Sequence, residues 1–445
     1  MAFGMTAIFL VPALAAPASG VAKANHAIMS VSRVAPSLIA ATREDEGIRF
    51  SCHRREVGPI RNAMTAYLRD LGIPGGLVAV SERPAQGALV YTLATSPHDT
   101  STLDLADRPE FGIVTERPSM EIQPEEPRSA PHTAVTQKEI LLALMQHGRL
   151  TELKGPDCSV QVLAQHVALR RNIVAWAEWL RWGWPNGGPA EWNPTYWDRG
   201  TPRAGVPVRE AIDDVFTNQK AYTIGCYTAT KLVMVKALLD FYGRVRPQPA
   251  VSDWIQGRLL SDHEPLCDVE PPVAWSFEPD FDPKDASRPG KLLSIVHGVS
   301  PKNFVPGDWA YLLNTDPVSS QKVGYEGSNA VYLGGGRFDD YYGENNHAFT
   351  YAEKLDEVFQ WRNGVFSRRR DSARRQPLTP EDLEQLGDPP GKGGLVEAWR
   401  IVPQFFGSAT SQVIVSRLRK SSRRSEPLRL SAVSAEESGS LSIER

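Results

Sequence analysis

Residues 221–243, AYTIGCYTATKLVMVKALLDFYG, predict the helix around which the fold is built. From Tyr227 onward, apolar residues occupy nearly every side of a helix of roughly four to five turns. Gly243 is expected to end this helix, because glycine tolerates the left-handed conformation common after a helix C-terminus. A helix that is apolar on all sides belongs inside a protein core.

Cys226 stands on or next to the first turn of this helix. Unpaired N–H groups and the helix dipole favour a thiolate at such a position. Papain-like enzymes present their nucleophile in this way, so Cys226 is the candidate nucleophile. On this stretch alone, an inert buried cysteine remains the alternative.

The composition is that of an ordinary globular protein, since 41% of the 445 residues are apolar and 23% are charged. A formal net charge of -3 and a pI near 6.3 give no reason to expect a nucleic acid or a membrane as partner. The four cysteines are widely spaced without a CxxC pair, which suits neither a zinc site nor a disulfide framework. We interpret them as mostly reduced thiols.

The N-terminus loosely resembles a signal peptide, with an apolar run at 7–16 followed by small residues. It has no basic residue before Lys23, and Pro12 interrupts the run. A cytoplasmic location is therefore favoured, and export is left open. The run is too short and broken to predict a transmembrane helix.

The chain divides into three predicted regions. Residues 1–135 are rich in Ala, Ser, Pro and Thr, and we expect a poorly structured region and linker with one helix at 57–71 and one strand at 87–93. Residues 136–367 are expected to form the folded domain. Residues 368–445 are basic and rich in Ser and Arg, and we expect them to be flexible.

Two helices are predicted before the cysteine segment. Thr136 and Glu139 form a capping box at the start of the first. Asp157 is expected to cap the second, which ends near Gly183. A short helix at 208–219 then leads to the cysteine.

After residue 247 the pattern changes to short strands, predicted at 254–260, 291–296, 309–313 and 330–333, before a helix at 351–361. Helices, then a cysteine-bearing helix, then an antiparallel sheet predict an α+β fold. The arrangement is papain-like (NlpC-like): the buried helix that bears the nucleophile packs on the antiparallel sheet, and a later strand supplies the partner of the thiol.

An aromatic loop lies between the helices and includes Trp192, Tyr196 and Trp197. Such a cluster can wall a substrate groove, although packing between loop and core is the default interpretation.

The segment with Asp262, His263, Glu264, Cys267 and Asp268 offers metal-ligand types within seven residues. Neighbouring residues on a strand or turn rarely point at one ion, so we expect no metal and no cofactor. The adjacent carboxylates also make Cys267 a weaker candidate nucleophile than Cys226.

Several motifs carry a resemblance to known enzymes. The segment VPGDWAY at 305–311, followed by SNAVYLGGGRF at 328–338, resembles the NlpC-type papain-like peptidases. The chain resembles the bacterial protein-glutamine gamma-glutamyltransferases of the spore-coat type more closely, over about 155–367. The motifs of that resemblance are RNIVA at 171–175, NPTYW at 193–197, CYTAT at 226–230, the Gly307–Asp308 strand and Gly327-x-Asn329.

The resemblance implies a calcium-independent crosslinking reaction between protein substrates that bear Gln and Lys. A cysteine thiolate attacks the carboxamide of a glutamine side chain and releases ammonia, and a lysine amine then opens the thioester. This chemistry needs a low-pKa thiol, a base and donors for the oxyanion. Cys226 fits the first need, and backbone N–H groups beside it fit the third.

The sequence departs from the family at the proton partners. The family has a glutamate immediately before the cysteine, and this chain has Gly225 at that position. The family also has Gly-Glu-Asn on the partner strand, and here Ser328 replaces the glutamate. A family histidine aligns with Tyr341 or Tyr342.

Two residues could compensate for the missing partners. Glu326 lies two residues before Ser328, on the same side of a strand. His347 follows soon after the hairpin, where Asp339 or Asp340 could orient it. We expect Ser328, Asn329 and Tyr342 to bind substrate, with the aromatic loop.

Two other functions remain open. A thiol peptidase or amidase on the same scaffold would use water in place of lysine. A catalytically inactive scaffold would bind a partner through the aromatic loop and the tail, and the substituted family residues support that reading.

Overall fold

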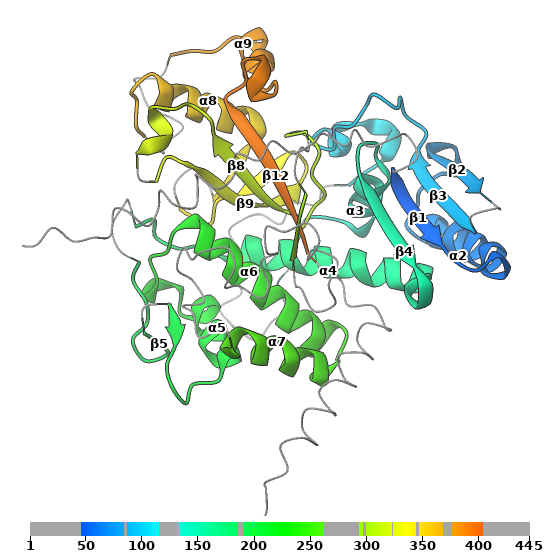
Figure 1. Ribbon diagram of the computed structural model, residues 1–445, viewed down its shortest axis with the longest axis horizontal. Helices are drawn as coiled ribbons and strands as arrows, with labels where there is room; N and C mark the ends of the chain where they lie inside the picture. Colours follow the sequence, from blue (N-terminus) through cyan, green and yellow to red (C-terminus); the bar gives the residue numbers. More distant parts are fainter. Residues whose placement is uncertain are drawn as a thin grey trace, which may run out of the picture.

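The structure is a computed structural model that describes residues 46–83, 87–114, 131, 133–185, 190–198, 200–261, 293–296, 300–322, 324–343, 347–367 and 376–403. It is a mixed α+β fold with two main sheets (Figure 1). Within these residues, no helix has both the length and the apolar character needed to cross a membrane.

The first sheet has four strands in the order β2-β3-β1-β4: β1 (Gly47–Ser51), β2 (Val78–Arg83), β3 (Ala88–Leu93) and β4 (Leu150–Lys154). Strand β1 runs antiparallel to β3 and parallel to β4. Helices α2 (Val57–Asp70) and α3 (Gln137–Met145) pack against it. The Thr136 hydroxyl caps α3 by accepting from the Glu139 N–H, which is one half of the predicted capping box.

The expectation of a poorly structured N-terminal region is wrong for residues 46–83 and 87–114. Ile48 and Phe50 of β1 and Leu89 of β3 are buried in the same core as Leu163 of helix α4 (Val160–Trp179). Because β4 follows α3 and pairs with β1, the first sheet is completed only by residues from the predicted folded domain. The predicted helix at 57–71 and strand at 87–93 are confirmed as α2 and β3, whereas a composition rich in Ala, Ser and Pro hid β1 and β2.

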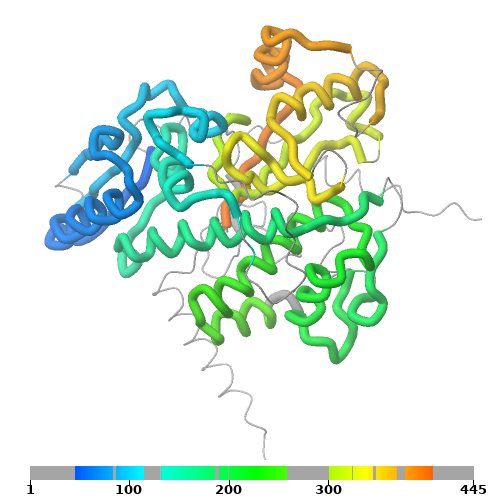
Figure 2. Tube along the Cα trace, turned by 180° about the vertical axis from the view of Figure 1, so that it is seen from behind, coloured from blue at the N-terminus to red at the C-terminus, as the bar shows by residue number. Residues whose placement is uncertain are grey.

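Helix α4 (Val160–Trp179) runs from this sheet to the centre of the molecule (Figures 1 and 2). Its N-cap is Ser159, whose hydroxyl accepts from the Val162 N–H, and not the predicted Asp157. Asp157 lies instead in a single 3₁₀ turn.

Helix α6 (Cys226–Asp240) packs on α4 and is buried along almost its whole length, as predicted. It does not end at Gly243, because a π-helical turn, Phe241–Val245, continues it. A Cβ on Gly243 would lie 2.5 Å from the Arg209 guanidinium, so this glycine makes room for a side chain from helix α5 (Val208–Thr217).

Helix α7 (Pro249–Ser261) occupies the segment predicted as a strand at 254–260. Val251 and Ile255, four residues apart, are its buried apolar side chains among the described positions, which is helical rather than strand spacing. The short strands β5 (Trp197–Asp198) and β6 (Thr201–Pro202) form a hairpin in the aromatic loop.

The second sheet is antiparallel and has the order β11-β10-β9-β8-β12-β7. Its strands are β7 (Leu293–Val296), β8 (Trp309–Asn314), β9 (Gly327–Gly334), β10 (Arg337–Asp339), β11 (Ala348–Thr350) and β12 (Val396–Pro403). One face carries Ala310, Leu312 and Ala330 and packs on helix α8 (Tyr351–Arg362). The other face carries Trp309 and Val331 and joins the core of α4 and α6.

The C-terminal region was predicted to be flexible, which is wrong for residues 376–403. They form helix α9 (Pro380–Leu386) and strand β12, which lies between β8 and β7 in the interior of the sheet (Figure 1). Val396 and Ala398 alternate with the exposed Glu397, which is the two-residue period of a half-buried strand.

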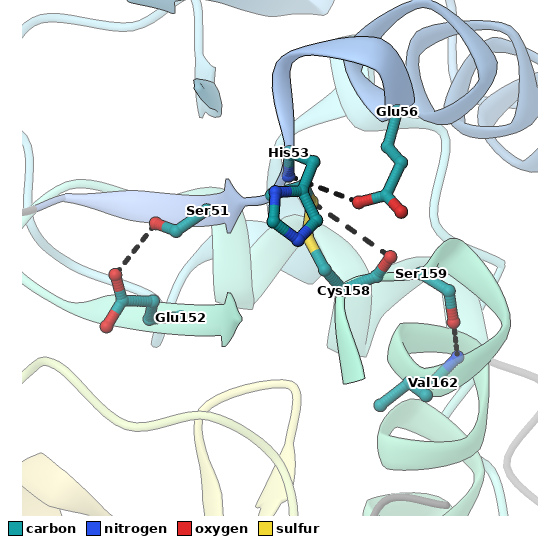
Figure 3. The surroundings of a disulfide bond; sticks show 8 residues. Ser51, His53, Glu56, Glu152, Cys158, Ser159 and Val162 are labelled. Atoms are coloured by element: carbon teal, nitrogen blue, oxygen red, sulfur yellow. Dashed lines mark hydrogen bonds between the residues drawn. A yellow bond between two sulfur atoms is a disulfide. The ribbon is translucent and has the colours of Figure 1, made fainter. Parts of the chain in front are cut away.

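Cys52 and Cys158 form a disulfide, which corrects the interpretation of mostly reduced thiols for these two residues (Figure 3). Their Cα atoms are 5.8 Å apart although 106 positions separate them in the sequence. The bond joins the end of β1 to the turn before α4. Disulfides of this kind are typical of oxidising compartments.

We expect reduction of this bond, or the double substitution Cys52→Ser and Cys158→Ser, to lower the free energy of unfolding by about 2–5 kcal/mol. The reason is that the bond restricts a long loop of the unfolded chain. Urea unfolding with and without reductant measures the effect, with Cys226→Ser as the control that keeps the bond. Equal stability of the oxidised, reduced and doubly substituted proteins would contradict the pairing.

Candidate active site

Cys226 carries a free thiol at the N-terminus of α6. It is half-buried, whereas residues 228–235 behind it are buried, so the thiol lies where the helix emerges from the core. Gly225 is the N-cap, with an extended backbone and no side chain to cap the first N–H groups. A Cβ built on Gly225 meets no atom within 4 Å, so there is space in front of the helix end.

Asn329 of β9 contacts this thiol. The Trp309 indole N–H donates to the Asn329 Oδ1 at 2.9 Å. An indole is a donor only, so the carboxamide oxygen must face Trp309 and the NH₂ group must face the cysteine. The Asn329 Nδ2 lies 3.8 Å from the Cys226 Sγ and donates toward it. The side chain predicted to bind substrate is thus a fixed donor beside the sulfur.

Two tyrosines of the hairpin end hold the residues on either side of the cysteine. The Tyr342 hydroxyl donates to the Ile224 carbonyl at 2.6 Å. The Thr230 hydroxyl donates to the Cys226 carbonyl at 2.8 Å, so the Tyr341 hydroxyl, 2.9 Å from the Thr230 Oγ1, is its donor.

Tyr341 is fully buried and adopts a left-handed backbone with a φ of 65°. Burial, with the nearby Asp339 carboxyl, raises its pKa well above the ordinary value. The phenol is therefore a neutral hydrogen-bond donor at neutral pH. The position that aligns with the family histidine supplies no base.

Glu326 precedes β9 and is half-buried, and its carboxylate accepts the Gly324 N–H at 2.8 Å. Its charge acts on Tyr311 of β8, which is paired with Asn329 across the two strands. Burial raises the pKa of Tyr311, and the charges of Cys226 and Glu326 raise it further. Glu326 and the thiol are therefore electrostatic neighbours of the same phenol.

His347 follows the hairpin, and its imidazole forms a hydrogen bond with the Tyr341 backbone. Its backbone is left-handed, with a φ of 59°, and its carbonyl accepts the Asp340 N–H. Burial and then the Arg181 charge lower its pKa to about 4. A group with this pKa is neutral at pH 7 and a weak base.

Ser328 is buried and pairs with Leu312, which faces the core under α8. Because side chains alternate along a strand, Ser328 points to the face opposite Asn329 and the thiol. The structure does not bring it together with Cys226. The expectation that Glu326 reaches the thiol from the side of Ser328 is therefore wrong, and the link that remains is the charge of Glu326 on Tyr311.

The aromatic loop packs mainly on itself and on the core. Trp197 is 2% exposed, donates its indole N–H to the Ala211 carbonyl and lies 5.0 Å, between ring centroids, from Trp192. Trp192 in turn meets Tyr222, and Tyr196 is half-buried. Trp197 therefore packs between the loop and the core, which was the default interpretation. A substrate role of this loop stays a prediction.

Among the described residues, no group of three His, Cys, Asp or Glu side chains is placed to hold a metal ion. The segment 262–268 lies outside the described residues.

Sequence reasoning missed Tyr311 and the strand β12 beside it. Strand alternation from Trp309 would have placed Tyr311 on the face of the thiol. Nothing in the sequence indicated that residues 396–403 pair with that strand.

Comparison with known proteins bears on this geometry. Residues 117–258, which include Cys226 and the whole of α4 and α6, match the family model described as protein-glutamine gamma-glutamyltransferase. The resemblance seen in the sequence is confirmed over this segment. The segment ends before the second sheet, so Asn329, Tyr311 and Glu326 lie outside the match.

Curated relatives agree with the family match. Protein-glutamine gamma-glutamyltransferases of Bacillus cereus (strain AH820) and Bacillus anthracis (strain CDC 684 / NRRL 3495) are each 28% identical over 148 residues. The alignment covers 32% of this chain and 42% of each relative, so the chain matches less than half the length of these proteins. The transglutaminase from Geobacillus stearothermophilus matches with 20% identity and a TM-score of 0.34, over 56% of this chain and 95% of that one.

We expect Asn329→Ala to slow alkylation of Cys226 by iodoacetamide roughly fivefold at fixed pH, the size expected for loss of a hydrogen bond worth about 1 kcal/mol. Asn329→Asp should slow it further, because a carboxylate repels a thiolate. Mass spectrometry of the Cys226 peptide gives the rate. Asn363→Ala, an exposed change at the end of α8, is the control. Unchanged rates in both Asn329 variants would rule out a role of this amide.

His347 should make stability depend on pH. The unfolded imidazole has a pKa of about 6.5, whereas the folded one has a pKa of about 4, so the unfolded chain binds more protons between these values. The contribution of His347 is therefore complete above pH 6.5 and is lost as the pH falls toward 4. We expect the Tm of the wild type to fall more between pH 7 and pH 4 than that of His347→Asn, which tolerates the left-handed backbone. Parallel curves would contradict this assignment.

Proposed function

We propose that this protein is a protein-glutamine gamma-glutamyltransferase that forms isopeptide crosslinks between Gln and Lys side chains through Cys226. The observation that carries the proposal is the free thiol at the N-terminus of buried α6, which lies within the segment that matches the family. The oriented Asn329 amide contacts this thiol. The proposal includes a papain-like arrangement of helix, thiol and partner strand, and a reaction that does not need calcium.

In the first step, the Cys226 thiolate attacks the carboxamide carbon of a glutamine side chain. The resulting oxyanion can be held by N–H groups at the start of α6 and by the Asn329 amide. The C–N bond then breaks, and ammonia leaves with a proton from the proton partner. The product is a thioester.

In the second step, a neutral lysine amine attacks the thioester carbon. The C–S bond breaks, the amine loses one proton, and the thiolate is restored with an isopeptide bond formed. We assign the proton partner to Glu326 rather than His347, because Glu326 shares Tyr311 with the thiol whereas His347 is next to Arg181 and is a weak base.

The test is incorporation of a labelled primary amine into a glutamine-rich acceptor protein. We expect labelling by the wild type, none by Cys226→Ala, and labelling slower by roughly a hundredfold with Glu326→Gln if this carboxylate is the base. Release of ammonia without amine incorporation would identify an amidase instead. A wild type that neither labels nor releases ammonia would refute the proposal.

A second variant uses the open space in front of α6. Since a Cβ on Gly225 meets nothing within 4 Å, Gly225→Glu can place a carboxylate beside the thiol, where the family has one. We expect amine incorporation to rise roughly tenfold, a modest contribution for a positioned base. Gly225→Gln is the matched control without charge. Equal rates in the two variants would show that a carboxylate at this position does not assist the thiol.

A further inference from the structure

The face of the second sheet that bears Asn329 continues beyond the reach of α6. Across β8 and β9 Tyr311 is opposite Asn329, and across β8 and β12 it is opposite Trp399. Leu313 is opposite Glu397 in the same way. By strand alternation, these side chains all lie on the face that carries the thiol contact.

The side chains of this face contact one another and reach solvent. The rings of Tyr311 and Trp399 are 5.5 Å apart, edge to face, and the Trp399 indole N–H donates to the Glu397 carboxylate at 3.3 Å. Tyr311, Leu313 and Trp399 are half-buried and Glu397 is exposed. The result is an aromatic surface with a carboxylate at its edge.

This surface is next to the candidate nucleophile. Tyr311 is one strand away from Asn329, about 4.8 Å in the direction across the sheet, and Asn329 contacts the Cys226 sulfur. The charged groups that act on Tyr311 are Cys226, Glu326 and Glu397, which are all negative when ionised. A cation is therefore the ligand that complements this surface.

We propose that Tyr311, Trp399 and Glu397 form the subsite that receives the lysine side chain of the acyl acceptor as its ammonium ion. The proposal rests on the proposed function. Aromatic rings attract an ammonium group through their faces, and a carboxylate adds an ion pair. The glutamine donor would then approach Cys226 from elsewhere.

The subsite agrees with the balance of protons in the second step. A bound ammonium must pass one proton to a carboxylate before its nitrogen can attack the thioester, and Glu326 is the nearby acceptor that we assigned. The nitrogen then forms the amide bond as the C–S bond breaks. The second amine proton is released to solvent, so the thiolate is restored and Glu326 keeps the proton that it took from the ammonium.

The test measures amine incorporation with a labelled pentylamine as the varied substrate, and then with the glutamine protein varied. We expect Glu397→Gln and Trp399→Leu each to raise the KM for the amine roughly threefold to tenfold, as for loss of a cation–π contact or an ion pair. The KM for the glutamine protein and the rate of ammonia release without amine should stay unchanged. Glu397→Lys should raise the amine KM further, because it repels the ammonium.

Glu384→Gln is the matched control, since it removes one exposed negative charge on α9, beyond the opposite face of the sheet. Its amine KM should equal that of the wild type. An unchanged amine KM in Glu397→Gln and Trp399→Leu, or an equal rise of both KM values, would overturn the subsite while the crosslinking function stands. A wild type without any Cys226-dependent activity would overturn both.

Discussion

Burial of helix α6 is the constraint on which the rest of the molecule depends. Residues 228–235 and 237–240 of the helix are buried, and large apolar side chains each contribute about 1.5–3 kcal/mol when removed from water. Such a helix must be covered on all sides, and α4, α5, α7 and β9 cover it. Its first turn is the part that reaches the surface, which is where Cys226 lies.

A buried ion pair fixes the sheet against these helices. The Arg170 Nη1 of α4 donates to the Asp308 Oδ1 at 2.7 Å. The Arg400 Nε of β12 lies 3.3 Å from the other carboxylate oxygen, Oδ2. Gly307 has a φ of 86° and approaches the Arg170 backbone so closely that a Cβ would lie 2.8 Å from its carbonyl oxygen. Removing one partner of such a buried pair typically costs about 3–5 kcal/mol. The contact sets the start of β8, and with it Trp309 and the amide that it orients.

The surroundings of the thiol consist of neutral donors close by and carboxylates farther out. Asn329 is the amide donor at the sulfur, and Tyr341 and Tyr342 support the helix start through hydroxyl groups that stay protonated or donate to carbonyls. Glu326 and Glu397 act on Tyr311 through their charges. The strands thus orient the donor that contacts the sulfur, whereas we assign proton transfer to a separate group, Glu326.

The sequence by itself determined the buried cysteine helix, the antiparallel strands after it and the family resemblance, because local periodicity and short motifs indicate these features. It did not determine that β1 and β4 pair in one sheet, that Cys52 meets Cys158, or that β12 inserts beside β8. Those contacts join residues about a hundred positions apart, and no local pattern encodes them. Tertiary structure also decided the facing of side chains: one position separates Ser328 from Asn329, yet strand alternation directs only Asn329 toward the sulfur.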